Sequence, residues 1–123
     1  MNDITNQFDP ADIEKNKTIA GLSYLGILFF LPLVSAPDSR FGKFHANQSL
    51  LIMLLGIAGG IIFAILVGIA TAAFSWTFLG IVGVLSTIFN VALAALFIMG
   101  LVFAFSGKAK KLPLIGEITI IKY

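Results

Sequence analysis

The side chains best able to do chemistry lie together in one stretch, Arg40-Phe41-Gly42-Lys43-Phe44-His45-Ala46-Asn47-Gln48. His45 is the only side chain in the sequence whose ordinary pKa lies near neutral pH. An imidazole that acts as a base or a metal ligand needs partners, but the sequence has no second His and no Cys. We therefore expect His45, with Asn47 and Gln48, to form hydrogen bonds within the fold or to lipid headgroups. Proton sensing at His45 is the alternative.

Charged residues are absent from the long run that follows this stretch. Between residues 44 and 107 there is no Asp, Glu, Lys or Arg, so no acid and base pair can be assembled there. We expect no catalytic residue, bound metal or cofactor, and the chain is not predicted to be an enzyme. A net charge of +2 is too small to indicate nucleic acid as a partner.

The composition indicates an integral membrane protein. Hydrophobic residues make up 59% of the 123 residues and charged residues 11%, whereas soluble domains have about 25% charged residues. A span needs roughly 20 apolar residues. We predict an all-α membrane helical bundle with three spans, at about 18–34, 46–73 and 77–106; four spans are the alternative. This domain, residues 9–107, would follow a disordered tail (1–8) and precede a basic interfacial tail (108–123).

Turn and cap residues set the predicted helix ends. Asp9 followed by Pro10 is typical of a helix start, and Pro32 and Pro37 would end the first helix. Asp38 or Ser39 is expected to cap the second helix, and Ser75 or Thr77 the third. Tyr24 would lie within the first span, where its hydroxyl needs a partner on another helix.

Small and polar residues recur along the two long helices. Gly56 and Gly60 form a Gly-x-x-x-Gly pair, which continues as an every-fourth-residue row through Ala64 and Gly68 to Ala72. Such rows let helix backbones approach closely. We predict that this row is a contact surface, either within the chain or between copies. Asn90, near the middle of the third span, is expected to hydrogen-bond across helices; lining a polar path is the alternative.

Basic residues near the span ends predict the orientation. Lys108, Lys110 and Lys111 follow the last span, and Arg40 and Lys43 precede the second. The positive-inside bias and a three-span layout place the C-terminus in the cytoplasm and the N-terminus outside. A four-span layout would put both termini on one side. In the three-span layout His45 should lie close to the C-terminal lysines, because the third helix returns to the side on which the second began.

The order of these motifs resembles a known family. Arg40, the string from Phe44 to Gln48, and Pro113-Leu114-Ile115-Gly116 are similar to motifs of a bacterial family of uncharacterised small membrane proteins. That family is in turn similar to the small subunit of the chloroplast inner-envelope protein translocon. The resemblance implies a multi-span bundle, which in the translocon subunit has four spans. It also implies a role in protein translocation.

The residues themselves favour a helical scaffold. Ion-coupled carriers keep ionisable groups within their spans, and none is present between His45 and Lys108. We predict a small subunit of the cell membrane, in bacteria the inner membrane, that assembles with itself or with other membrane proteins. A conduit, either a small transporter or a subunit of a peptide translocation channel, is the alternative.

Overall fold

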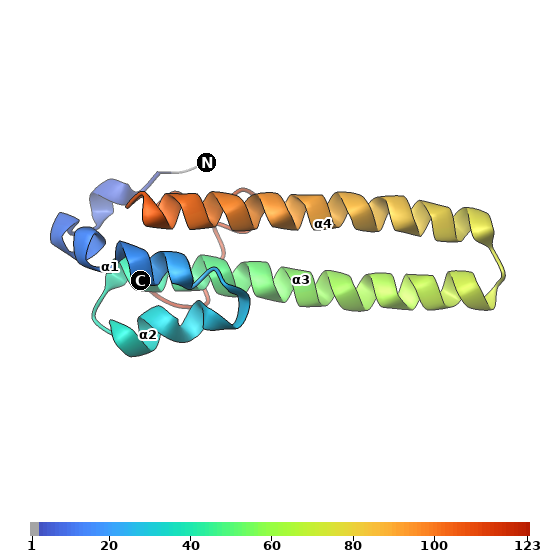
Figure 1. Cartoon of the computed structure of the whole chain (residues 1–123), viewed down its shortest axis with the longest axis horizontal. Helices are drawn as coiled ribbons and strands as arrows, with labels where there is room; N and C mark the ends of the chain where they lie inside the picture. The colour runs from blue at the N-terminus through green and yellow to red at the C-terminus, as the bar shows by residue number, and fades with distance from the viewer. Residues whose placement is uncertain (1–2) are drawn as a thin grey trace.

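A computed structural model describes residues 3–123, except the side chains of residues 26 and 27. Within these residues the chain forms α-helices, 3-10 helices and a single β-bridge, with no strands. The elements are η1 (Thr5–Gln7), α1 (Pro10–Leu22), η2 (Gly26–Phe30), α2 (Leu31–Ser35), α3 (Arg40–Ala72) and α4 (Trp76–Phe105). The predicted all-α fold is confirmed. Figure 1 shows α3 and α4 as a long antiparallel hairpin, with the other elements gathered at one end.

The hairpin follows from caps that the sequence contains. The Ser39 side chain accepts a hydrogen bond from the Gly42 N–H at 2.9 Å, and the Ser75 side chain one from the Phe78 N–H at 3.2 Å. Each satisfies a backbone donor that the first turn of a helix leaves free. At the far end of α4, Gly107 has a φ of +74°, which only glycine adopts without strain. Both predicted caps, and the Asp9 cap of α1, are confirmed.

The segment predicted as the first span is not one helix. α1 ends at Leu22, the chain turns, and η2 and α2 run back beside it. In a continuous helix the Ser23 carbonyl would accept a hydrogen bond from the backbone N–H four residues later. Here it accepts one from the Ser49 hydroxyl instead. The turn therefore results from a contact with α3, and residues 18–34 form a short helical return.

The two ends of the chain lie together at the base of the hairpin, the end formed by the start of α3 and the end of α4. The Ile4 N–H donates to the Ala109 carbonyl at 2.9 Å, and the Ala109 N–H donates to the Thr5 hydroxyl at 2.9 Å. The prediction that the termini lie on opposite sides is therefore wrong for this structure. Residues 3–8 of the predicted disordered tail are ordered by these bonds, and residues 1–2 lie outside the described residues.

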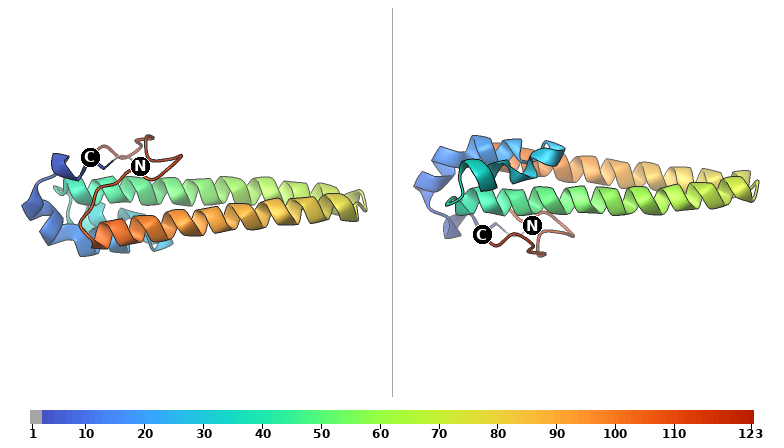
Figure 2. Two further views of the ribbon diagram at one scale, coloured as in Figure 1. Left: turned by 90° about the horizontal axis from the view of Figure 1, so that it is seen from above. Right: turned by 90° about the horizontal axis from the view of Figure 1, so that it is seen from below.

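The segments around this base form what we call the collar, residues 3–35 and 108–123. Its two main parts lie on opposite faces of the hairpin, with α1 and α2 on one face and the C-terminal segment on the other (Figure 2). The buried core lies here, built around Phe8, Tyr24, Phe41 and Phe44. The C-terminal segment, predicted to be an interfacial tail, packs in large part against the helices, and Leu112 and Ile115 are buried.

Beyond the collar the hairpin is bare, and the predicted glycine row matches its seam only at Gly56 among the glycines of the row. A Cβ atom on Gly59 would collide with the ring of Phe89, whereas nothing described lies within 4 Å of a Cβ on Gly60 or Gly68. Phe63 and Phe89 pack with ring centroids 5.5 Å apart. Gly56, the first residue of the predicted row, does lie at this seam, because a Cβ on it would be 3.6 Å from Leu93 of α4. Gly60 and Gly68 lie outside the seam, and Gly60 is about 100° around α3 from Gly59.

Asn90 also differs from its predicted role. Its side chain is exposed, and its amide approaches the Ser86 hydroxyl of the same helix at 3.5 Å. No bond from Asn90 to another helix is present among the described residues. Helical spacing alone does not show which face of α4 meets α3.

Gly59 and Gly60 give a matched test of the seam. We expect Gly59→Leu to lower the free energy of unfolding by about 1–3 kcal/mol, because the added side chain would displace the Phe89 ring. Gly60→Leu should change it by less than about 0.5 kcal/mol, as surface substitutions do. Thermal unfolding in a detergent that keeps the chain monomeric measures both. Equal losses from the two variants would show that the seam is misplaced.

Candidate functional site

Four polar side chains are buried along one stretch of α3, where the collar surrounds the hairpin. They are His45, Asn47, Gln48 and Ser49, each with at most 4% of its surface exposed. Every one of them bonds to another segment of the chain. We call this set, with Tyr24, the polar clasp.

His45 joins the collar on both faces of the hairpin. Its Nε2 lies 2.9 Å from the Lys108 carbonyl oxygen, and its Nδ1 lies 2.6 Å from the Tyr24 hydroxyl. A carbonyl can only accept, so Nε2 carries a hydrogen, and in the neutral ring Nδ1 accepts from the Tyr24 hydroxyl. These two contacts hold the neutral ring in one tautomer. Protonation of Nδ1 would require the Tyr24 hydroxyl to change from donor to acceptor.

Aromatic rings surround this pair. The centroids of the Phe41 and Phe44 rings lie 4.8 and 5.0 Å from that of the imidazole, both edge-on. Tyr24 reaches His45 by lying against α4 at Gly100, where any Cβ would collide with the phenol ring. The surroundings of the two hydrogen bonds are thus largely apolar, and a hydrogen bond is electrostatically stronger there than in water.

Asn47 and Gln48 hold the C-terminal segment through its backbone. The Asn47 oxygen accepts from the N–H groups of Ile120 and Ile121 at 2.7 and 3.0 Å, and its amide donates to the Ile118 carbonyl at 2.9 Å. The Gln48 oxygen accepts from the Leu112 N–H at 3.0 Å. The Gln48 amide nitrogen is buried and has no partner among the described residues.

Asp12 makes a further link, which the sequence analysis did not identify. Its carboxylate accepts from the Phe41 N–H at 3.0 Å and from the Asn16 amide at 2.7 Å, so it joins α1 to the first turn of α3. Burial alone would raise the pKa of Asp12. The hydrogen bonds to Ser39, Phe41 and Asn16 outweigh burial, and the pKa is lowered.

The predicted site residues separate into two groups. His45 lies beside the C-terminal lysines, as expected, and Tyr24 has its predicted partner on another helix. Phe44 is buried in the core, and Arg40 donates to the Gln7 carbonyl at 3.2 Å. The others do not join the clasp: Gly56, Gly60 and Asn90 lie farther along the hairpin, Lys110 lies over the Phe103 ring, and Pro113 is exposed.

Tyr24→Phe tests the clasp at one atom. Removing the hydroxyl leaves the buried Nδ1 of His45 without its donor, and we expect a loss of about 1–3 kcal/mol in the free energy of unfolding. Tyr123→Phe removes the same hydroxyl from a partly exposed ring and should change it by less than about 0.5 kcal/mol. Urea or thermal unfolding in detergent compares them. If Tyr24→Phe is no worse than Tyr123→Phe, the hydrogen bond to His45 does not stabilise the fold.

The Asp12 link should depend on pH. Its pKa is lower in the folded chain than in the unfolded chain, so its contribution is full above the ordinary value of about 3.9 and is lost as the pH falls through the folded value. We expect Asp12→Ala to reduce the free energy of unfolding by about 1–2 kcal/mol at pH 7. Unfolding measured from pH 7 down to pH 3 should show the difference from the wild type narrowing below about pH 4. A difference that stays constant would contradict this role.

Known proteins similar to the chain come from two bacteria. Magnetosome protein MamF of Magnetospirillum gryphiswaldense is 33% identical over 101 residues, which cover 81% of this chain and 78% of that protein. Magnetosome protein MamF of Paramagnetospirillum magneticum is 46% identical over 39 residues, covering 32% of this chain and 35% of that protein. Magnetosome protein MmsF of the same organism is 42% identical over 43 residues, or 35% and 40% of the two chains. No family model and no solved structure matches the chain.

These findings agree with the fold. α3 and α4 are long and apolar enough to cross a membrane, with mean hydropathies of 2.9 and 2.5 over their most apolar stretches. The chain is a membrane protein with bacterial relatives. Because the alignment with MamF of Magnetospirillum gryphiswaldense covers more than two thirds of both proteins, the chain belongs to the family of magnetosome protein MamF.

Proposed function

We propose that this chain is a non-enzymatic scaffold subunit of a bacterial membrane, with its C-terminus in the cytoplasm, whose bare hairpin assembles with further copies of itself. The observation that carries this proposal is the open small-residue face of α3. Gly60 and Gly68 have no described atom within 4 Å of an added Cβ, whereas the space beside Gly59, about 100° around the helix from Gly60, is filled by Phe89. Small residues at such a face let a second helix approach closely.

The polar groups of the hairpin support a scaffold over a conduit. Thr71 and Thr87 donate to the carbonyls of Val67 and Gly83, each four residues back on its own helix. These hydroxyls are satisfied locally, as is common in membrane helices. A transport path would instead need polar or ionisable groups directed into a shared cavity.

The relatives suggest where such a scaffold acts. All three are named magnetosome proteins. For this chain we propose the corresponding role of a structural protein in a specialised bacterial membrane. Its clasp would hold the collar as a fixed platform, while the hairpin provides the surface that assembles.

Paired substitutions on α3 test this assembly. In membranes, chemical crosslinking over a range of protein-to-lipid ratios should capture oligomers of the wild type. Gly60→Leu with Gly68→Leu should lower the association constant about tenfold, which corresponds to about 1.4 kcal/mol. The bulky side chains would hold the helices apart. The matched control is Ala58→Leu, which adds bulk to an exposed position of α3 outside the row.

The control also separates assembly from folding. Ala58→Leu should leave the crosslinked fraction unchanged, and all variants should keep the unfolding temperature of the monomer in detergent. A wild type that never crosslinks, or a double variant that crosslinks as well as the control, would contradict self-assembly through this face.

A further inference from the structure

The length of the hairpin exceeds the thickness of a bilayer. α3 has 33 residues, which at 1.5 Å each makes it about 50 Å long. The hydrocarbon core of a bilayer is about 30 Å thick, and an average tilt of about 20° shortens the helix only slightly along the normal. About 20 Å of α3 must therefore project beyond the hydrocarbon.

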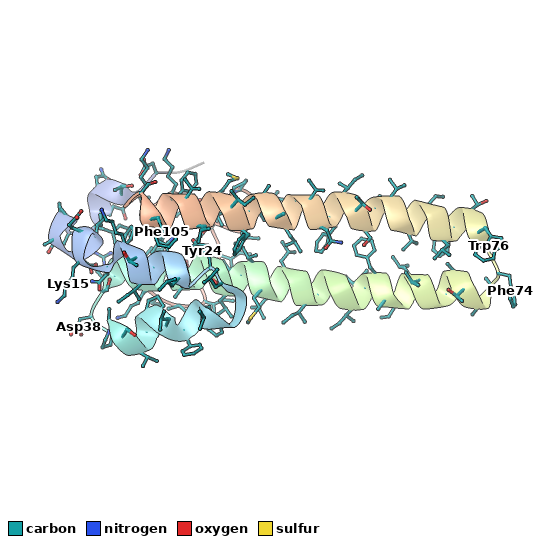
Figure 3. The ribbon with its side chains drawn as sticks, in the orientation of Figure 1. Lys15, Tyr24, Asp38, Phe74, Trp76 and Phe105 are labelled. Atoms are coloured by element: carbon teal, nitrogen blue, oxygen red, sulfur yellow. The ribbon has the colours of Figure 1, made fainter. Side chains whose placement is uncertain are left out.

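The collar covers a matching length of α3. The residues buried at its start run from Phe41 to Leu51, a distance of about 15 Å along the axis. The remaining part, from Ile52 to Ala72, is about 30 Å long, and its large side chains are mostly exposed and apolar. Figure 3 shows these side chains pointing outward along the bare hairpin. The length of α3 that the collar covers is therefore close to the length that must project from the hydrocarbon. The length of α3 that is left bare matches the thickness of the hydrocarbon.

The chain begins α1 and returns to the start of α3 at the same end of the hairpin. Near the start of α1, Asp12 is bonded to Phe41, and Gln7 accepts a hydrogen bond from Arg40. Lys15, on α1, and Asp38, in the loop that joins α2 to α3, both lie at the end of the molecule opposite Trp76 (Figure 3).

The turn between α1 and η2 reaches only part of the way along α3. Ser23 is bonded to Ser49, nine residues or about 14 Å beyond Arg40. That distance is less than half the hydrocarbon thickness. The return is therefore too short to cross a bilayer from the level at which α3 begins.

We infer that the chain crosses the membrane twice, through α3 and α4, and that the collar does not cross but lies in the headgroup layer of one leaflet. Leu25, at the turn of the return, is 47% exposed and faces the acyl boundary. All eight Lys and Arg residues lie in the collar or the first turns of α3, at the level where basic side chains meet lipid phosphates. The far turn, Phe74 to Thr77, carries no charge and can insert without moving a charge across the bilayer.

Single cysteines test this topology cleanly because the chain has none of its own. The variants are Lys15→Cys, Asp38→Cys, Lys122→Cys and Thr77→Cys, all at exposed positions. A membrane-impermeant maleimide applied to sealed vesicles of each orientation should label residues 15, 38 and 122 from the same side, and residue 77 from the other. Labelling of residues 15 and 38 from opposite sides would overturn the inference, because the segment between them would then be a span.

A depth measurement distinguishes the headgroup layer from its alternatives. A nitroxide on Leu25→Cys should report a depth near the lipid phosphates, whereas one on Ile62→Cys, which is also exposed, should report the bilayer centre. The inference fails if Leu25 is as deep as Ile62, since the return would then penetrate the hydrocarbon. It also fails if Leu25 is as accessible to water-soluble reagents as Asp38, since the collar would then stand clear of the membrane.

Discussion

The fold depends on hydrogen bonds at the base of the hairpin, between buried polar side chains of α3 and the backbone of the C-terminal segment. Burying an amide or imidazole without a partner costs roughly 2–7 kcal/mol, and His45, Asn47 and Gln48 are all buried on α3. The C-terminal segment has the complementary need, since its backbone lies outside helices and strands and must find partners elsewhere. The oxygens of Asn47 and Gln48, the Asn47 amide and the His45 Nε2 all bond to this segment, while the Gln48 amide nitrogen has no partner among the described residues. The burial of these side chains and the path of the segment therefore depend on each other.

This arrangement divides the molecule into two parts, a base held by polar and aromatic contacts and a hairpin whose surface is apolar. At the base, polar and aromatic side chains fix α1, α2 and the C-terminal segment around the hairpin. Beyond it, α3 and α4 meet along one seam, which includes Gly59 and Phe89, and expose apolar side chains elsewhere. The clasp sets the geometry of the base, and the bare hairpin is left free to meet lipid or another helix.

The sequence predicts those features that depend on local chemistry. The apolar runs locate α3 and α4, and Asp9, Ser39 and Ser75 cap helices as their residue types suggest. The break after Leu22 was not predictable, because it rests on the bond from Ser49 to Ser23, a contact between residues distant in the sequence. The sequence also suggested that Gly60 lies at the seam, whereas Gly59 is the residue that packs against Phe89. The position of α4 beside α3 decides between them, and spacing along one helix does not reveal it.

The candidate site was predicted in part. The polar stretch around His45 stood out as the one place where polar side chains precede a long apolar run, and Tyr24 was expected to need a partner. The role of Asn47 in holding three backbone groups required the path of the C-terminal segment, which no pattern in residues 108–123 reveals. Similarity to the chloroplast translocon subunit stays a prediction, as does any role in translocation.

Hydrogen exchange of the C-terminal segment tests the clasp most directly. In the folded wild type, the backbone amides of Leu112, Ile120 and Ile121 are bonded to Gln48 and Asn47, so they should exchange far more slowly than in an unstructured peptide. Asn47→Ala should remove the protection at residues 120 and 121 and leave that of amides in the middle of α4 unchanged. Rapid exchange of these two amides in the wild type, or unchanged protection in Asn47→Ala, would contradict the proposed clasp.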